Sequence, residues 1–410
     1  MFKLQRVPLQ VELLLIELQQ FFNDYQWLHF QSILLALLVT PYKATLSGIV
    51  KVLNFGSHIS KHNEFLNDCS TILSKVLKFQ AMLILNLVKK SGEAIYFIID
   101  DTSNKKRGEH ITAAFKFFDH TSKQYILGQQ LVCAIIEYRG IVIPYAIEVY
   151  IPKDRAKANG NGFKKKTQIA AEILSEFEAD EKQQVFVVAD TYYSSPAIMK
   201  VCRDSKYSFV SMLKTNRILK ISKKQMNVSS YTKRFFTKKK RKRIIKIGSN
   251  KYQTHSQRVS LKTGGAVKIV CTRSLSHRTV KTIFTTNTAL SVESILTAYS
   301  KRWSIEVFFK MSKQYLGLKA YQNRNLEAVE SSVRLSLISY NLLTHAFIEK
   351  VRAKGKKLTD KKLAHFSVVE TRDYLRRIAM IDSIDYCFEL NLNKSKNIII
   401  KEIKKLSLAA

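Results

Sequence analysis

Acidic residues, cysteine, proline and glycine are all scarce in this sequence. Its 410 residues include 32 Asp and Glu against 68 Lys and Arg, which gives a net charge of +36. The five cysteines are dispersed and form no CxxC pair, which excludes a disulfide framework and a cysteine zinc finger. His58 and His62 are four residues apart but no second ligand pair follows, whereas a structural zinc site needs four ligands. Five prolines and thirteen glycines predict compact packing without a long linker.

Long apolar runs are also missing. The longest, "ILLALLV" (33–39) and "AMLILNLV" (81–88), are shorter than the ~20 residues that a membrane-spanning helix needs. The first residues favour the start of an amphipathic helix over a signal peptide. We therefore expect no membrane partner. The basic residues are spread from end to end, and a protein of this charge is suited to a polyphosphate such as nucleic acid.

Residues 1–90 show the spacing of apolar residues that predicts helices. Within them, 44–67 predicts two short helices around "NFGS", the second opened by Ser60 and Lys61. Two interpretations stay open, a DNA-binding helix-turn-helix and a plain helical hairpin. Near residue 94 the pattern changes to that of strands.

Two buried strands are predicted to end in acids. "AIYFIID" (94–100) is a continuous apolar run that ends at Asp100 and Asp101, and "QQVFVVAD" (183–190) ends at Asp190. Between them lie β-rich segments and an amphipathic helix over 166–179, and a further helix and strand follow. This order predicts an α/β fold, in which sites form at the carboxyl ends of the strands.

The character changes again over 215–288, where short β-like segments surround a basic tract and predict an inserted β-rich subdomain. The tract "KKKRKR" (238–243) suits a loop that contacts phosphates, although a solvated hairpin tip is an alternative. Helices return over 289–350. The remaining residues, 351–410, are basic and carry no recognisable motif.

The segment 298–314, "AYSKRWSIEVFFKMSKQ", predicts one continuous helix that is mostly buried and carries a single polar stripe. At 100° per residue, five polar side chains fall within about 80° of arc: Tyr299, Arg302, Glu306, Lys310 and Lys313. Ordinary ion pairs four residues apart would explain the stripe without any chemistry, and Lys310 could either pair with Glu306 or contact DNA.

The alternative to ion pairing is a metal site. Asp101, Asp190 and Glu306 could converge at one edge of the sheet, where three carboxylates repel one another unless a cation lies among them. Mg²⁺ or Mn²⁺ suits oxygen ligands, and two such ions about 4 Å apart can activate a water and stabilise the leaving oxygen of a phosphodiester. Asp100 could replace Asp101 as the ligand, because adjacent strand residues point to opposite faces.

The motifs resemble one branch of the DDE insertion-sequence transposases, the IS-four-like group. Two residues separate Tyr299 from Arg302, three separate Arg302 from Glu306, and six separate Glu306 from Lys313, which is the Y-(2)-R-(3)-E-(6)-K signature. "IDDTS" (99–103) resembles the first-aspartate motif of the group and favours Asp101 over Asp100. "VVADTYYSS" (187–195) resembles the second-aspartate motif. The likeness covers roughly residues 94–350.

The resemblance implies an RNase H-like catalytic core with a β-rich insertion, preceded by a helical DNA-binding region. The expected division is 1–90 for that region, 91–214 and 289–350 for the core, 215–288 for the insertion, and 351–410 for a basic region suited to dimerisation. It also implies a role for each signature residue: Asp101, Asp190 and Glu306 as catalytic ligands of two Mg²⁺ or Mn²⁺ ions, Arg302 and Lys313 as phosphate contacts, and Tyr299 as a residue beside the DNA backbone.

The activity that the resemblance implies is DNA transposition. The enzyme would cleave double-stranded DNA at terminal inverted repeats and transfer the ends into target DNA, as a homodimer associated with the nucleoid in a bacterial cytoplasm. Relatives can pass through a hairpin end with the help of an insertion-domain tryptophan, but Trp27 and Trp303 both lie outside 215–288. Two alternatives remain, an inactive DNA-binding descendant and a nuclease of the same fold that never joins strands.

Overall fold

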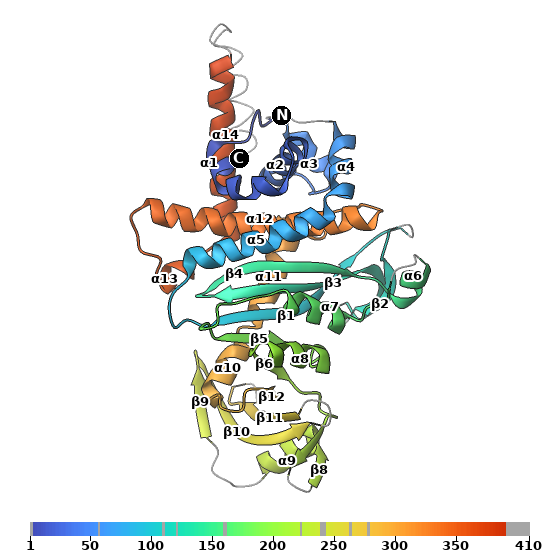
Figure 1. Cartoon of the computed structure of the whole chain (residues 1–410), viewed down its shortest axis with the longest axis vertical. Coiled ribbons are helices and arrows are strands. Elements are labelled where there is room, and N and C mark those ends of the chain that lie inside the picture. The colour runs from blue at the N-terminus through green and yellow to red at the C-terminus, as the bar shows by residue number, and fades with distance from the viewer. Residues whose placement is uncertain are drawn as a thin grey trace.

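The computed structural model describes residues 3–55, 58–108, 111–119, 122–158, 162–221, 224–237, 243–261, 265–276 and 279–390. Of the predicted phosphate-contacting loop "KKKRKR", only Arg243 lies within the described residues. Figure 1 shows an elongated molecule with helices at one end, a sheet across the middle and further strands at the other end.

The N-terminal region is helical, as the spacing of its apolar residues predicts. Asn23 caps the second helix, because its side chain accepts a hydrogen bond from the backbone N–H of Gln26. In the range of the predicted helix-turn-helix, the described residues form one turn of α-helix, one turn of 3₁₀-helix and the start of a ten-residue helix that begins at Ile59. The elements are α1 (Leu9–Leu15), η1 (Ile16–Phe21), α2 (Asp24–Val39), α3 (Leu46–Ile49), η2 (Val50–Val52), α4 (Ile59–Asp68) and α5 (Ser70–Val88).

Among the described residues, α5 is long and apolar enough to cross a membrane, which differs from the expectation that every apolar run is too short. The difference arises because polar residues interrupt its apolar runs without making the helix polar as a whole. Core helices pass the same test of length and composition, and α5 packs against α12 (Leu326–Ala353) and strand β4 (Ile141–Tyr150).

The central sheet confirms the predicted α/β class. Five of its strands lie side by side in the order β4-β3-β1-β5-β6. Neighbouring strands among β4, β3 and β1 are antiparallel, whereas β1, β5 and β6 are parallel. An edge strand, β2, also pairs with β3. The bounds are β1 (Ile95–Lys105), β2 (Phe115–Asp119), β3 (Gln124–Tyr138), β5 (Val185–Ala189) and β6 (Ser208–Met212).

Helices cover both faces of this sheet. Ile98 of β1 belongs to a core shared with Ile305 and Phe308 of helix α11 (Trp303–Tyr315), while Phe97 and Ile99 belong to a second core on the other face. That second core includes residues of α7 (Lys166–Ser175) and α8 (Pro196–Asp204). A short helix, α6 (Lys153–Ala158), links β4 to the segment before α7. Adjacent residues of β1 therefore face different helices.

Strand β1 is longer than the apolar run predicts, so that Asp100 and Asp101 lie within the strand and not at its end. The reason is its two unequal neighbours. Pairing with β5 stops at Ile99 opposite Ala189, whereas pairing with β3 continues to Lys105. The two aspartates consequently lie just beyond the end of the parallel pairing, next to Asp190.

The described residues of the range 215–288 form six strands and helix α9 (Val228–Thr237). Strand β12 pairs with β6, so these strands extend the central sheet instead of forming a separate one. Figure 1 shows them at the end of the molecule opposite the N-terminal helices. The six are β7 (Ile218–Ile221), β8 (Lys224–Asn227), β9 (Arg243–Ile247), β10 (Asn250–Leu261), β11 (Gly265–Ser274) and β12 (Val280–Thr285).

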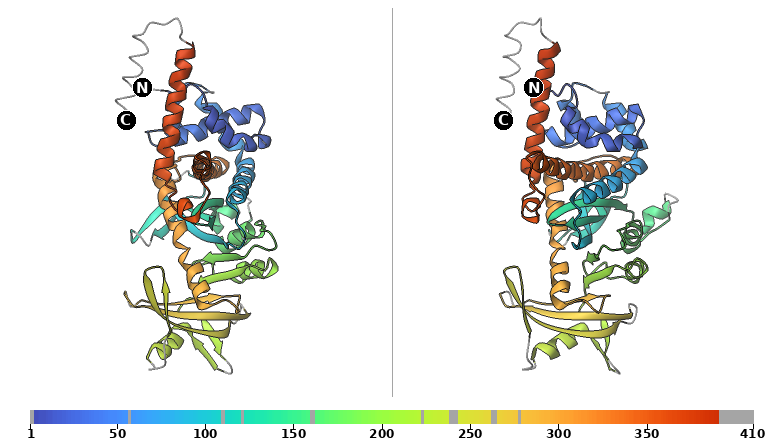
Figure 2. Two further views of the ribbon diagram at one scale, coloured as in Figure 1. Left: turned by 90° about the vertical axis from the view of Figure 1, so that its left-hand side faces the viewer. Right: turned by 60° about the vertical axis from the view of Figure 1, so that its left-hand side comes forward.

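The segment predicted as one helix is two. Helix α10 (Val292–Ser300) ends before a tight turn at Lys301 and Arg302, and α11 begins at Trp303. The N–H of Arg302 bonds the carbonyl of Tyr299, a three-residue spacing that tightens the chain there. Figure 2 shows these helices, in orange, running in line from the strands of 215–288 towards the helical end of the molecule.

After α12 and a single turn, α13 (Asp360–Leu363), the chain forms a long helix, α14 (Val368–Leu390), which the sequence did not predict. It packs against α2 and α12. Arg372 donates hydrogen bonds to the carbonyls of Leu38 and Thr40 at the end of α2, and Arg6 pairs with Asp382. The described part of the C-terminal region is therefore fastened to the N-terminal helices.

Candidate active site

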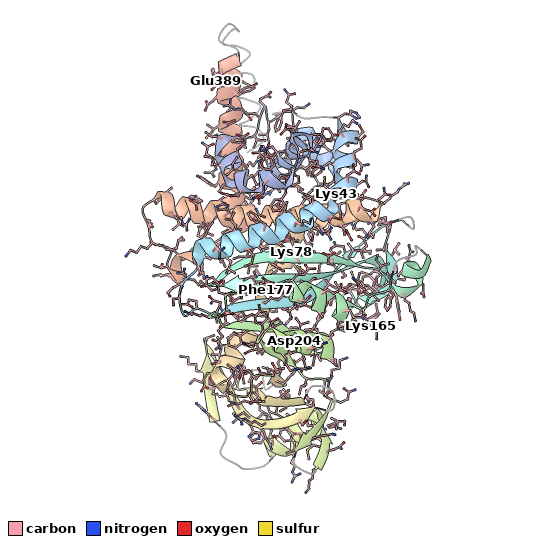
Figure 3. All side chains as sticks on the ribbon, in the orientation of Figure 1. Lys43, Lys78, Lys165, Phe177, Asp204 and Glu389 are labelled. Atoms are coloured by element: carbon pink, nitrogen blue, oxygen red, sulfur yellow. The ribbon has the colours of Figure 1, made fainter. Side chains whose placement is uncertain are left out.

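Asp101 is held by two groups on the α7–α8 face of the sheet. Its Oδ2 accepts a hydrogen bond from Lys166 Nζ at 2.7 Å, and its Oδ1 accepts one from the Tyr193 hydroxyl at 3.1 Å. Lys166 is the first residue of α7, directly after Lys165, which Figure 3 labels at the start of that helix. An ammonium group therefore balances the Asp101 carboxylate.

Asp100 points to the opposite face, where its Oδ2 accepts a hydrogen bond from Arg302 Nη1 at 3.1 Å. Burial, and then the charge of Asp190, raise the pKa of Asp100 to about 7, while the guanidinium of Arg302 opposes the rise. Three carboxylates, Asp100, Asp101 and Asp190, thus share one region of the sheet.

Asp190 directly follows β5, and its side chain stabilises the turn formed by the residues after it. Its Oδ1 accepts hydrogen bonds from the backbone N–H groups of Tyr192 at 2.8 Å and Tyr193 at 3.3 Å. Burial raises the pKa of Asp190 above its usual value; these two N–H groups oppose the rise and the charge of Asp101 adds to it. Asp101 and Asp190, predicted as partners, do lie close enough to influence each other's ionisation.

Glu306 lies in the first turn of α11 and pairs with Arg302. This is the ion pair four residues apart that the sequence offered as an alternative explanation of the polar stripe. The competing pair with Lys310 is not formed, and Lys310 is exposed. Because Arg302 also contacts Asp100, its guanidinium links the glutamate helix to β1.

The other two signature residues lie at opposite ends of this segment. Tyr299 is on α10, where burial raises the pKa of its hydroxyl and the nearby Arg302 opposes the rise. Lys313 is near the end of α11, and its Nζ donates to the carbonyl of Ser103 on β1 at 2.8 Å. Burial, and then the charge of Lys319, lower the pKa of Lys313 to about 8. The break at Lys301 separates Tyr299 from the helix that carries the others.

The donor chemistry of the acids fits a hard divalent cation, because every candidate ligand is a carboxylate oxygen. The arrangement is not that of a preformed site: in the part of the chain that the structure describes, no three His, Cys, Asp or Glu side chains gather closely enough to hold one ion. Lys166 and Arg302 balance Asp101 and Glu306 instead.

Sequence reasoning missed two contacts of Asp101 and one contact of the turn before α11. Lys166 and Tyr193 both hold Asp101, and Lys301, in the turn before α11, pairs with the buried Glu137 of β3. The tyrosines of "VVADTYYSS" were part of a recognised motif, so Tyr193 had a signal. Lys166 had none, because it ends a run of three lysines (164–166) of which only one turns inward.

A pocket of about 320 Å³ lies between α10, α11 and strands β9 to β12. It is lined by Tyr299, Arg302 and Trp303, and by Tyr252 from β10. The Trp303 side chain is 63% exposed, which differs from the expectation of a mostly buried helix. Although Trp303 lies outside 215–288, the fold thus brings it against that region.

The family described as DDE superfamily endonuclease matches residues 17–279, which include Asp100, Asp101 and Asp190 but not Glu306. No curated protein matches the chain.

Proposed function

The chain belongs to the DDE superfamily of endonucleases, and from this premise we propose that it is a DNA transposase that cleaves transposon ends and joins them to target DNA. Two observations support the proposal: β1 and the turn after β5 bring Asp100, Asp101 and Asp190 close together, and Arg302 joins Asp100 to Glu306 of α11. Glu306 thus reaches the acids through Arg302 and Asp100, while Asp101 faces α7. The spacing of Tyr299, Arg302, Glu306 and Lys313 further favours the IS-four-like group for this transposase.

The strand order supports an RNase H-like core. Three antiparallel strands followed by two parallel ones, in the order β4-β3-β1-β5-β6, fit the order that such a core requires. The strands of 215–288 come between the second aspartate and the glutamate helix along the chain, as an insertion subdomain would.

In this proposal Asp101, Asp190 and Glu306 hold two divalent ions, Mg²⁺ or Mn²⁺. DDE superfamily endonucleases generally use such ions, which activate the attacking oxygen and stabilise the leaving oxygen of a phosphodiester. The protein's own groups position them: the N–H groups of Tyr192 and Tyr193 fix the carboxylate of Asp190, and the hydroxyl of Tyr193 orients Asp101.

Arg302 has two roles in this proposal. Without metal and DNA it neutralises Asp100 and Glu306; when both are bound, it exchanges Glu306 for a phosphate of the transposon end. Lys313 is a second phosphate contact, and its ammonium is already oriented by the carbonyl of Ser103. Tyr299 packs beside the DNA backbone.

The proposal also gives a role to the N-terminal and C-terminal regions. Residues 1–90 read the terminal repeats and 351–410 contribute to a homodimer. Helix α14 supports the second role, because Val369, Ile381 and Phe388 are large apolar side chains exposed along it. Double-stranded DNA is the substrate, in the nucleoid of a bacterial cytoplasm.

The test is cleavage and joining by the purified full chain. Supercoiled plasmid with Mn²⁺ or Mg²⁺ reports nicking, and a labelled duplex with a free 3′-OH reports joining to that plasmid. Asp190→Asn should abolish both, because the amide cannot hold a cation as a carboxylate does. Asp204→Asn is the matched control: Asp204, labelled in Figure 3, is exposed at the end of α8, so this variant should keep both activities.

The outcomes separate the alternatives. Nicking without joined products would favour a nuclease that never transfers strands. DNA binding without nicking, under every metal tried, would favour an inactive descendant. Equal nicking by the wild type and Asp190→Asn would remove Asp190 from the site and with it the proposed mechanism.

A further inference from the structure

A groove of about 870 Å³ lies between the N-terminal helices and the end of α11, and we call it the basic groove. Four segments form it: the loop 40–44 after α2, the end of β1 with nearby residues (105–108 and 111), the end of α11 with residues of the loop that follows (313–324), and one side of α14. Figure 3 labels Lys43 of the first segment, close to the helical layer above the sheet.

The described residues that line the basic groove include nine basic side chains and no acid. This composition is unlike an ordinary solvated face, where charges of both signs alternate. The nine come from all four segments: Lys43, Lys105, Lys106, Arg107, Lys313, Lys319, Arg324, Arg372 and Arg376.

The floor of the groove holds one buried and two half-buried cations, each hydrogen-bonded to backbone carbonyls. Lys106 is only 6% exposed, and its Nζ donates to the carbonyl of Tyr321 at 2.6 Å. Lys313 donates to the carbonyl of Ser103, and Arg372 to two carbonyls of the α2 terminus. Carbonyls orient these groups without carrying a formal negative charge, and a buried cation without a counter-charge, as at Lys106, is costly. Lys313 and Arg372 are partly buried and lie within the influence of Asp119 and Asp373.

The pKa values of Lys106 and Lys313 lie below the usual value of lysine. Burial lowers the pKa of Lys106 to about 7, and burial with the charge of Lys319 lowers that of Lys313 to about 8. An anion in the groove would oppose both effects, because a nearby negative charge favours the protonated amine.

The rim supplies further cations. Lys43, Lys105, Arg107, Lys319 and Arg324 are exposed, and none forms an ion pair with an acid in the part of the chain that the structure describes. Nine positive groups spread along one groove suit a chain of repeated negative charges better than a single small anion. The chemistry is that of a phosphodiester backbone.

Two elements run from the candidate active site into the groove. Lys313 comes seven residues after Glu306 on α11, or about 10 Å along the helix, and Lys105 comes four residues after Asp101 on β1, or about 13 Å along the strand. One nucleotide of a strand advances about 3.4 Å, so that this separation corresponds to roughly three or four nucleotides.

We propose that the basic groove binds the phosphodiester backbone of DNA three or four nucleotides away from the bond that the acids act on. The proposal rests on the proposed function for what happens at the acids, but the binding itself needs no chemistry. The loop after α2 and helix α14 thereby become part of the DNA path, together with the glutamate helix.

The test is the salt dependence of DNA binding in EDTA, where no cleavage occurs. Fluorescence anisotropy of a labelled duplex gives the association constant between 50 and 200 mM salt. Lys319→Ala/Arg324→Ala removes two rim charges, so the slope of log K against log salt should fall by about 1.8. Across this fourfold salt range the wild type should therefore lose roughly tenfold more affinity than the variant.

Two further variants make the result specific to the groove. Lys43→Ala/Arg107→Ala removes two charges from its other segments and should reduce the slope equally. Lys354→Ala/Lys356→Ala removes two exposed charges beyond the far end of α12 and should leave the slope unchanged. Thermal unfolding of each variant confirms that all three are folded, since every substituted side chain is exposed.

An unchanged slope in both groove variants would overturn the proposal, as would an equal reduction in the Lys354/Lys356 control. Tighter binding of an RNA duplex of the same length, with the same loss in both groove variants, would assign the groove to RNA instead. If the protein does not cleave DNA but the salt slopes are as predicted, the proposed function is rejected and the proposal for the basic groove is kept.

A modified duplex tests the position of the contact. Neutral methylphosphonates three and four nucleotides from the cut should weaken binding by the wild type, and they should cause no further loss of affinity in the groove variants.

Discussion

Lys166 donates a hydrogen bond to Asp101, with 2.7 Å between Nζ and Oδ2, and both side chains are largely shielded from solvent. The ammonium lies over the ring of Tyr192, 4.8 Å from its centroid. A cation that binds Asp101 must compete with this internal one. Lys166 is therefore expected to set the metal concentration at which the site fills.

Substitution Lys166→Met should strengthen metal binding, because the competing charge is removed while most of the side-chain volume is kept. Mn²⁺ binding, followed by electron paramagnetic resonance or calorimetry, should show a lower dissociation constant than in the wild type. Lys164→Met is the matched control, since Lys164 pairs with the exposed Glu172 on the outer side of α7. A dissociation constant that rises in Lys166→Met would show that the lysine assists the ion.

Asp100 and Asp101 should differ in their effect on cleavage. Asp101→Asn is expected to abolish nicking, because a proposed metal ligand is lost. Asp100→Asn should reduce nicking by about 10- to 100-fold, the range for a group that orients another functional side chain, since Asp100 keeps Arg302 in place beside the acids. Single-turnover nicking rates at saturating Mn²⁺ measure both. The reverse order of severity would make Asp100 the ligand.

The pocket beside Trp303 leads to a prediction about an unstacked base. Trp303→Ala should reduce the fluorescence increase of 2-aminopurine placed next to the cleavage site, because the exposed indole and Tyr252 offer a stacking surface in that pocket. Tyr125→Ala removes an exposed aromatic on β3 and should leave the signal unchanged. An undiminished signal in Trp303→Ala would assign stacking to another aromatic.

Much of the site follows from local pattern. An apolar run of seven residues predicts a buried strand, and Asp190 could be placed because β5 ends where its apolar run ends. The sequence does not decide to which face of the sheet Asp100 and Asp101 each point, because both follow the same apolar run. Only the long pairing of β1 with β3 determines which helix each side chain contacts. A resemblance of motifs chose Asp101, but the contacts of Lys166 and Arg302 needed the fold.

Elements stabilised by distant contacts were the hardest to predict. Helix α14 has charges on every side, so its periodicity is weak, and its position depends on Arg372 and on the pair of Arg6 with Asp382. The break before α11 is similar. Lys301, in the tight turn between the two helices, keeps right-handed helical backbone angles and pairs with Glu137, a partner 164 residues away in sequence.

A buried histidine pair should make stability depend on pH. His29 of α2 and His62 of α4 share a hydrogen bond, with 2.9 Å between their Nδ1 atoms. Burial lowers the pKa of His62 to about 4, and the charge of His29 adds to this; burial also lowers the pKa of His29, with Glu64 opposing and Lys61 adding. The ring of Tyr25 packs against His29.

In the unfolded chain both histidines titrate near about 6.5, so that below this pH the unfolded state binds more protons than the folded state. The free energy of unfolding should therefore fall as pH decreases from about 6.5 towards 4. Urea unfolding at pH 4.5 to 7.5 measures the slope, and His62→Gln should flatten it, since glutamine does not titrate but can still bond His29. Equal slopes in the two proteins would contradict this origin.

Gly317 is where the glutamate helix meets the N-terminal helices. It follows α11 with φ of +77°, a conformation that favours glycine. A Cβ there would lie 3.0 Å from the Cβ of Ala44 and 3.3 Å from Cδ2 of Leu37. Gly317→Ala should therefore lower the free energy of unfolding by about 1–3 kcal/mol, combining backbone strain with a steric conflict. The urea midpoint, at an unchanged m value, measures this loss.

Gly355→Ala separates the two causes. Gly355 has φ of +62°, but a Cβ there would meet nothing within 4 Å, so this variant carries the backbone strain alone, about 1 kcal/mol. Gly317→Ala should cost more than Gly355→Ala by the energy of the conflict with Ala44. Because Gly317 also lines the basic groove next to Ala44, only Gly317→Ala should weaken DNA binding in EDTA. Equal losses of stability, or equal DNA binding, would mean that the loop after α2 moves aside without disturbing the groove.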